Sequence, residues 1–115
     1  MMGLAPGSRV WLRPGPTDFR KAINGLAGIV EGVMRHDPFS GHYFVFCNRT
    51  RTLLRILYWD RNGFCLWHKR LEQDRFRWPR TEGEARELSR EEFAWLLRGL
   101  DIAQAHPARS YASAM

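Results

Sequence analysis

The chain has 115 residues, the usual size of one domain, and 44% of them are hydrophobic, which is enough to build one packed core. A formal net charge of +6 favours a polyanionic partner, with DNA, RNA and anionic membranes as the candidates. No apolar run reaches membrane-spanning length, and glycine and proline interrupt the first residues, so we expect a cytoplasmic protein without a signal peptide or a transmembrane segment.

Positive charge is concentrated in the middle of the chain. Residues 42–80 contain nine Lys or Arg against three Asp or Glu, whereas residues 81–115 contain four against six. Clustered cations neutralise nucleic-acid phosphates, so the middle segment is the candidate binding region. The alternative is that an Arg-rich, high-GC genome produces basic domains that have no role in nucleic-acid binding.

The first predicted elements are a short strand and a helix. Residues 8–12 form the candidate strand, which Gly15-Pro16 ends. Thr17 or Asp18 is a favourable N-cap, and apolar residues recur at helical spacing as far as Met34, so we expect a helix that begins near Asp18. Three glycines inside this helix indicate close packing against a sheet: Gly25, Gly28 and Gly32.

A β region follows the loop at residues 36–41. Runs of apolar and aromatic residues predict three consecutive strands, at 43–48, 53–59 and 64–71. The turn before the last strand contains Asn62-Gly63, a strong hairpin signal, so we expect an antiparallel meander. Polar and apolar residues do not alternate cleanly in these strands, which predicts that both faces of the sheet are partly covered.

The C-terminal part completes the predicted fold. Residues 76–79 read as an irregular aromatic segment, and residues 89–92 match a capping box that opens a helix running towards Gly99. We therefore expect a single domain over residues 1–102 and a flexible tail over 103–115. The fold class is α+β: a three-stranded antiparallel meander with a short N-terminal strand and helices packed on it.

Two cysteines, Cys47 and Cys65, fall in predicted strands. Neither belongs to a C-x-x-C pair, so neither a zinc site nor a disulfide framework is indicated. We interpret both as buried free thiols.

Seven short sequence blocks follow one another along the chain, and together they are more specific than any one of them. They are Pro16-Thr17-Asp18-Phe19-Arg20-Lys21, Asp37-Pro38-Phe39-Ser40-Gly41, Phe44-Val45-Phe46-Cys47-Asn48-Arg49, Leu57-Tyr58-Trp59-Asp60, Gly63-Phe64-Cys65-Leu66-Trp67, Lys69-Arg70-Leu71-Glu72 and Phe76-Arg77-Trp78-Pro79. The series resembles the TnpB accessory proteins, or second open reading frame proteins, of insertion-sequence 66 type transposons. The resemblance covers residues 16–79 closely and extends to Gly99, with mild departures at Cys47 and His68.

The resemblance implies a bacterial mobile element that encodes a separate, larger DDE-type transposase. The small protein would assist transposition and would itself be no enzyme. DNA and the transposase are then the expected partners, with no cofactor, no metal and no membrane contact.

The candidate nucleic-acid-binding residues are mostly cations in or beside the predicted strands. They are Arg20, Lys21, Arg49, Arg51, Arg55, Arg61, Lys69, Arg70, Arg75 and Arg77, together with Trp67. Aromatic rings among these charges suit base stacking or cation–π contact, although a place in the core is the alternative for each of them: Tyr58, Trp59, Trp67 and Trp78.

A metal-dependent nuclease is the alternative that the carboxylates raise. Asp18, Asp37 and Asp60 lie in the family-like blocks, but a helix cap, a turn before proline and a hairpin turn explain them locally. The histidines show no metal-ligand spacing, and the sequence contains no P-loop and no nucleophile motif.

Three functions therefore remain open. The basic β region favours a DNA-binding accessory factor, and the acidic C-terminal helix and abundant aromatics favour an adaptor that docks on the transposase. A nuclease subunit has the least support. If the protein binds DNA, we expect mainly electrostatic binding with weak sequence preference, because no recognition helix is evident.

Overall fold

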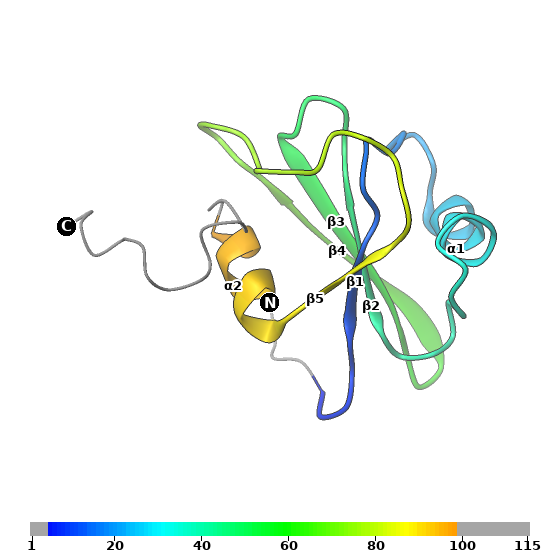
Figure 1. Ribbon diagram of the computed structural model, residues 1–115. Coiled ribbons are helices and arrows are strands. Elements are labelled where there is room, and N and C mark those ends of the chain that lie inside the picture. Colours follow the sequence, from blue (N-terminus) through cyan, green and yellow to red (C-terminus); the bar gives the residue numbers. More distant parts are fainter. Residues whose placement is uncertain (1–4, 99–115) are drawn as a thin grey trace.

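The computed structural model describes residues 5–98 as a five-stranded mixed sheet with two helices (Figure 1). The elements in chain order are β1 (Val10–Leu12), α1 (Ile23–Gly32), β2 (Tyr43–Cys47), β3 (Leu53–Asp60), β4 (Gly63–Arg70), β5 (Arg86–Leu88) and α2 (Arg90–Leu97). The strand order across the sheet is β4-β3-β2-β1-β5. This arrangement confirms the α+β class. The expected start of the C-terminal tail lies outside the described residues.

The predicted meander is confirmed, but it is only part of the sheet. Strands β2, β3 and β4 pair antiparallel in sequence, with Phe44 opposite Leu57 and Asp60 opposite Gly63. Strand β1 pairs parallel to β2, which α1 makes possible as the crossover connection, and β5 pairs antiparallel to β1. The three-stranded description is therefore corrected to five mixed strands.

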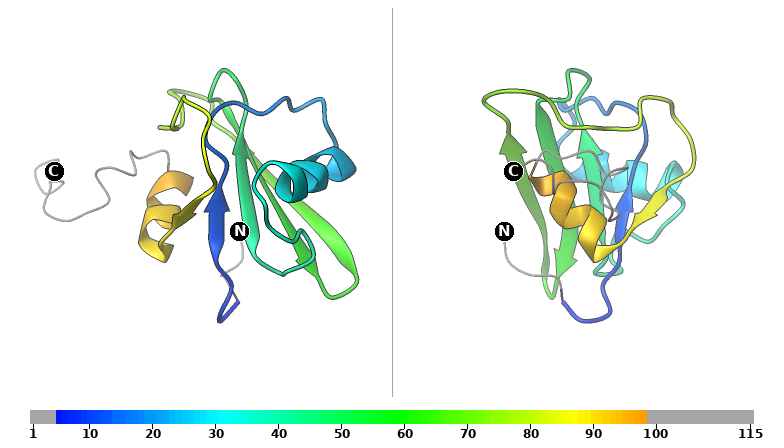
Figure 2. Two further views of the ribbon diagram at one scale, coloured as in Figure 1. Left: turned by 45° about the vertical axis from the view of Figure 1, so that its right-hand side comes forward. Right: turned by 60° about the vertical axis from the view of Figure 1, so that its left-hand side comes forward.

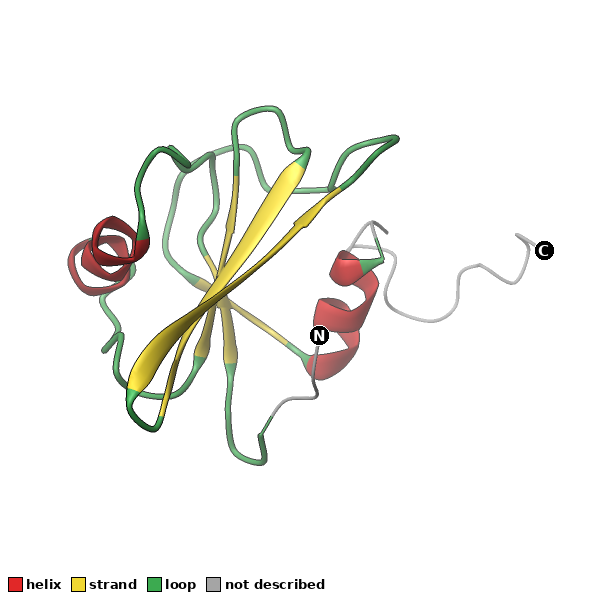
Figure 3. Cartoon of the chain, turned by 180° about the vertical axis from the view of Figure 1, so that it is seen from behind, coloured by secondary structure: helices red, strands yellow, loops and turns green. Residues whose placement is uncertain are grey.

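Both faces of the sheet are covered, as the mixed residue pattern predicts. Successive strand residues point to opposite faces, so Phe44 and Phe46 pack towards α1 whereas Val45 and Cys47 pack towards the side of α2. Figure 3 shows the two helices on opposite sides of the sheet. All five residues of β2 are buried, which explains why this strand is apolar without alternation.

Helix α1 begins later than the sequence predicts. Its N-cap is Ala22, whose side chain makes no capping bond, and the helix starts at Ile23 instead of near Asp18. Asp18 is occupied elsewhere, since its Oδ1 accepts hydrogen bonds from the backbone N–H of Arg20 at 2.9 Å and from Arg20 Nε at 3.0 Å. The carboxylate therefore closes a turn before the helix. Phe19 lies in that turn, yet it packs against the α1 side of the core.

The glycines of α1 do not mark close packing against the sheet, so that interpretation is wrong. A Cβ atom placed on Gly28 or Gly32 would meet nothing within 4 Å, and on Gly25 it would meet only the side chain of Lys21. Buried apolar residues make the contact with the sheet: Leu26, Ile29 and Val30.

Helix α2 confirms the predicted capping box. Ser89 Oγ accepts from the backbone N–H of Glu92 at 3.0 Å, and the N–H of Ser89 donates to Glu92 Oε1 at 2.8 Å. Phe93 and Leu96 are buried beneath the helix. Within residues 5–98, neither helix is long and apolar enough to cross a membrane.

Candidate nucleic-acid interface

Three connecting segments meet at one end of the sheet: residues 13–22, 48–52 and 71–85. The topology explains this, because β1, β2 and β4 run in the same direction and all end there, whereas β3 runs the opposite way and begins there. Figures 1 and 2 show these segments side by side at the top of the molecule. The site therefore combines residues that are far apart in the sequence.

Backbone hydrogen bonds join the three segments to one another. The N–H of Phe76 donates to the carbonyl of Arg51 at 2.8 Å. The N–H of Gly15 donates to Pro79 O at 2.8 Å, and the N–H of Thr17 donates at 2.8 Å to the carbonyl of Cys47, the last residue of β2 before the 48–52 segment. Paired backbone groups limit the freedom of loops, so this end of the sheet presents its side chains from a fixed framework.

The turn between β2 and β3 is organised by Asn48. Its side-chain oxygen accepts from the N–H groups of Thr52 and Leu53 at 3.0 Å each, and its Nδ2 donates to Thr50 Oγ1 at 3.1 Å. Arg51 adopts φ 62° within the turn, in the left-handed region. The geometry directs the chain back into β3 while Arg49 stays exposed.

Two buried rings anchor the segment that follows β4. Phe76 is fully buried, and Trp78 is 6% exposed with its Nε1 donating to Arg13 O at 3.1 Å and Gly15 O at 3.0 Å. The neighbouring Arg75 and Arg77 are exposed, because side chains alternate along this extended stretch. Trp78 is therefore a core ring that holds the loop, and the same alternation points the two arginines outward.

Five arginines on the two loops form what we call the arginine surface: Arg49, Arg51, Arg75, Arg77 and Arg80. No carboxylate within residues 5–98 forms an ion pair with any of them. Four arginines elsewhere are paired with carboxylates: Arg9, Arg20, Arg70 and Arg86. Arg35, Arg61 and Arg98 are exposed and, within residues 5–98, form no ion pair, but they are separate from this group in sequence. Unpaired guanidinium groups on a rigid support are suited to an external anion.

Members of the arginine surface line three hollows at this end of the molecule. The first, of about 870 Å³, lies between the 13–21 segment and Arg49, and Asp18 and Glu82 are among its lining residues. The second, of about 200 Å³, is lined by Gly15, Pro16, Asn48, Arg49, Arg51, Trp78, Pro79 and Arg80. The third, of about 370 Å³, is lined by Arg51, Asp74, Arg75, Phe76, Arg77 and Arg80.

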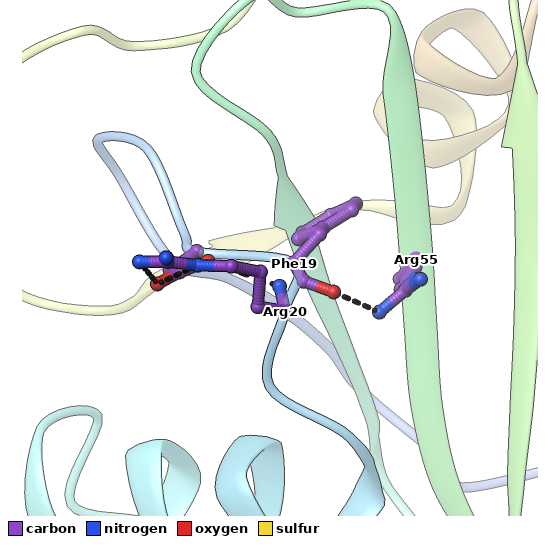
Figure 4. A network of polar contacts seen from close by, with 4 residues as sticks. Phe19, Arg20 and Arg55 are labelled. Carbon is purple, nitrogen blue, oxygen red and sulfur yellow. Dashed lines mark hydrogen bonds and ion pairs between the residues drawn. The ribbon is translucent and has the colours of Figure 1, made fainter.

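Arg55, a candidate binding residue, makes structural contacts instead of facing solvent. Its Nη1 donates to the carbonyls of Phe19 at 3.1 Å and Lys21 at 3.3 Å, and its Cζ lies 4.6 Å from the centroid of the Phe19 ring (Figure 4). Its Nε is buried without a hydrogen-bond partner. This side chain holds the segment before α1 against β3.

The other predicted cations are dispersed. Lys69 Nζ donates to Leu97 O at 2.6 Å and so binds the C-terminal end of α2. Arg61 lies in the turn between β3 and β4, at the opposite end of that hairpin from the arginine surface. Arg20 and Lys21 are exposed beside the widest hollow, with Arg20 paired to Asp18 at 2.8 Å.

Arg80 is the one member of the arginine surface that the candidate set omits, although it lies within the basic segment.

The remaining aromatic candidates lie away from the arginine surface. Trp67 packs half-buried against the core on the α2 side, and Tyr58 stacks on Tyr43 with centroids 4.6 Å apart.

At the β3–β4 turn, three rings form what we call the aromatic cluster: Phe39, Trp59 and Phe64, with centroids 5.0–5.2 Å apart. Phe39 is 57% exposed. Phe39 lies in the loop before β2, whereas its ring partners lie on β3 and β4, so no local sequence pattern predicts this cluster.

Two of the three carboxylates of the nuclease hypothesis, those of Asp18 and Asp37, make local hydrogen bonds. The hydrogen bonds from Arg20 lower the pKa of Asp18 from 3.8 to about 2, and Asp37 Oδ1 accepts from the N–H of Phe39 at 2.9 Å. Asp60 is exposed beside the β3–β4 turn. Residues 5–98 contain no group of three His, Cys, Asp or Glu side chains placed to hold a metal ion.

The two cysteines are free but differently exposed. Cys47 is buried, and desolvation raises the pKa of its thiol to about 12, so a thiolate is strongly disfavoured. Cys65 is only half-buried, which corrects the expectation that both thiols are buried.

These features define a small α+β protein with an arginine surface on hydrogen-bonded loops at one end of its sheet, whose members form no ion pair within residues 5–98. The chain belongs to the family described as IS66 Orf2 like protein, whose model matches residues 8–107. It is 41% identical over 93 residues to the uncharacterized protein y4hO of Sinorhizobium fredii, covering 81% of each chain. It is 39% identical over 101 residues to the uncharacterized protein y4jC of the same organism, covering 88% of this chain and 86% of the relative.

Membership of this family confirms the resemblance found in the sequence and supports an accessory role associated with transposition. No solved structure matches the chain.

Proposed function

We propose that this protein is a non-catalytic accessory factor of transposition that binds DNA through its arginine surface. One observation carries the proposal: five guanidinium groups without carboxylate partners among residues 5–98 project from two hydrogen-bonded loops at one end of the sheet. Such groups would neutralise phosphates and release counterions. Membership of the IS66 Orf2-like family supports transposition as the process in which the protein binds DNA.

The expected binding is electrostatic and weakly dependent on sequence. Neither helix presents a basic face to a groove: α2 carries Glu91 and Glu92 in its first turn, and α1 has neither acidic residues in its first turn nor basic residues in its last. Roughly four to six phosphate contacts would lower affinity by a few orders of magnitude between low and physiological salt. Specificity for the ends of the element would then come from the transposase.

The test is a salt titration of binding to terminal-repeat DNA and to scrambled DNA. The triple variant Arg49→Gln, Arg51→Gln, Arg77→Gln is expected to bind more weakly and to flatten the salt slope by about 2 to 3, since each lost contact contributes about 0.9. The matched control, Arg35→Gln, Arg61→Gln, Arg98→Gln, removes the same charge from exposed positions outside the arginine surface. If the two variants lose DNA affinity equally, net charge, and not this surface, governs binding.

The non-catalytic part of the proposal rests on the carboxylates. Asp18 and Asp37 lie beside separate turns, Asp60 is the last residue of β3, and the three share no metal-binding group within residues 5–98. The purified protein is expected to leave DNA intact in magnesium or manganese. Cleavage that is lost in a folded Asp60→Ala variant would establish an enzyme instead.

Docking on the transposase is a second candidate function, and the aromatic cluster favours it. Phe39 is more than half exposed at the end of the hairpin opposite the arginine surface. Exposed aromatic side chains are characteristic anchors of protein interfaces. The two functions are compatible, because the surfaces that they require are separate.

A further inference from the structure

Two of the three hollows share a wall. Arg51 and Arg80 line both the hollow of about 200 Å³ and the hollow of about 370 Å³. Arg49 also lines the first, whereas Arg75 and Arg77 also line the second. Each hollow is therefore lined by at least three arginine residues, and two of these line both hollows.

We propose that these two hollows bind two neighbouring phosphates of one nucleic-acid strand, with Arg51 and Arg80 bridging between them. A guanidinium group carries five N–H donors in a planar fork, so a single arginine can donate to two phosphates at once. The inference rests on the proposed DNA binding and adds the place and the length of the backbone segment that is held.

The lining of the hollows favours phosphates over bases. The smaller hollow has no carboxylate in its lining, and Asp74 is the single acidic residue lining the larger one. The rings at this end, Phe76 and Trp78, are buried, and the indole N–H of Trp78 is already donated to backbone carbonyls. Because neither hollow is lined by an exposed ring among residues 5–98, the site as described gives single strands no advantage over duplex.

The backbone holds the two hollows at a fixed separation. The hydrogen bond from the N–H of Phe76 to Arg51 O joins the two loops at the shared wall, and the bond from Gly15 N–H to Pro79 O fixes the residue before Arg80. A preformed pair of sites costs less ordering on binding than flexible side chains would. The widest hollow is a poorer phosphate site, because Asp18 and Glu82 line it.

Single substitutions test the bridging role of the shared arginines. Arg51→Gln and Arg80→Gln are each expected to weaken duplex binding about tenfold, against two- to threefold for Arg75→Gln, because a bridging arginine loses two charge-assisted contacts and Arg75 loses one. Arg35→Gln, at an exposed position outside the arginine surface and outside the candidate set, is expected to leave affinity unchanged. Amide NMR spectra verify that each variant is folded, and Arg80→Gln keeps the test decisive if Arg51→Gln perturbs its turn.

Small phosphate probes test the pairing itself. Thymidine dinucleotide with a 5′-phosphate carries two phosphates at strand spacing, thymidine 5′-monophosphate carries one, and pyrophosphate carries two at closer spacing. The dinucleotide is expected to bind more tightly than the monophosphate and to shift the Nε–H signals of both Arg51 and Arg80. Tighter binding of pyrophosphate than of the dinucleotide would assign the site to a free polyphosphate and overturn the strand assignment.

The failure of this inference is distinguishable from failure of the proposed function. If duplex DNA binds but all five arginines contribute equally and the dinucleotide binds no better than the monophosphate, the paired site is wrong while DNA binding through the arginine surface stands. If wild-type protein has no affinity for DNA at low salt, the proposed function is wrong, and the same outcome rejects a site for a nucleic-acid strand.

Discussion

Arg55 holds the segment before α1 against β3, whereas Arg49, in the turn just before β3, faces solvent. Arg49 and Arg55 lie on either side of the start of β3, and the basic pattern selects both. Arg49 is exposed, whereas Arg55 donates to the carbonyls of Phe19 and Lys21, which precede it by 36 and 34 residues. That contact depends on how the segment before α1 crosses β3, which no local pattern encodes.

The structural role of Arg55 gives a stability prediction. Arg55→Ala is expected to lower the free energy of unfolding by about 1–3 kcal/mol, because two backbone carbonyls lose their donor and the Phe19 ring loses its cation. Urea unfolding followed by tryptophan fluorescence measures the change. The control, Arg49→Ala at an exposed position, is expected to change stability by no more than about 0.5 kcal/mol. Equal stability of the two variants would contradict the structural assignment.

At the scale of elements, the sequence predicts a strand or helix correctly where a strong pattern lies within a short window of residues. It fails where an element depends on partners elsewhere in the chain. The apolar runs of β2, β3 and β4 and the capping box of α2 are encoded within short windows, and the structure confirms them. Strand β5 was missed because it has three residues, two of them exposed and charged, and exists only through pairing with β1. The start of α1 was misplaced because Asp18 is an equally good residue for a turn, and Arg20 completes that turn.

Two glycine substitutions test this account of the elements. Gly28→Ala is expected to raise the free energy of unfolding by about 0.5–1 kcal/mol, since the site is helical and a Cβ would meet nothing within 4 Å. Gly15→Ala is expected to lower it by more than about 1 kcal/mol, because φ is +83° and a Cβ would lie 2.7 Å from Glu82 Cγ and 3.3 Å from Glu82 Cα. Thermal or urea unfolding of both variants measures the two shifts, and a destabilised Gly28→Ala would restore the close-packing interpretation.

At the scale of the whole molecule, the candidate site is an outcome of topology more than of composition. The basic segment 42–80 was evident in the sequence, but its charges divide between the arginine surface, the hairpin turn at Arg61 and the fixed contacts of Arg55 and Lys69. Parallel pairing of β1 with β2, which the meander prediction did not contain, brings the 13–22 segment beside the two arginine loops. The sequence therefore indicated the kind of ligand, whereas strand order decides which cations act together.

Because the arginine surface and the aromatic cluster lie at opposite ends of the β3–β4 hairpin, DNA binding and docking on the transposase should be separable. Phe39→Ala removes an exposed ring and is expected to retain DNA affinity within about twofold, since it changes no charge. The same variant is expected to recover less transposase in a pull-down, as truncating an aromatic anchor commonly costs about 2 kcal/mol or more.

The reciprocal experiment tests the arginine variant for transposase binding. The Arg49→Gln, Arg51→Gln, Arg77→Gln variant is expected to lose DNA binding and to retain the transposase when the pull-down is performed with nuclease-treated proteins. Phe39 contacts Trp59 and Phe64 and no arginine of the arginine surface, so neither variant should alter the other function through direct contact. If the arginine variant loses the transposase even without DNA, the two partners share one surface. If Phe39→Ala retains the transposase fully, the aromatic cluster is not the docking site.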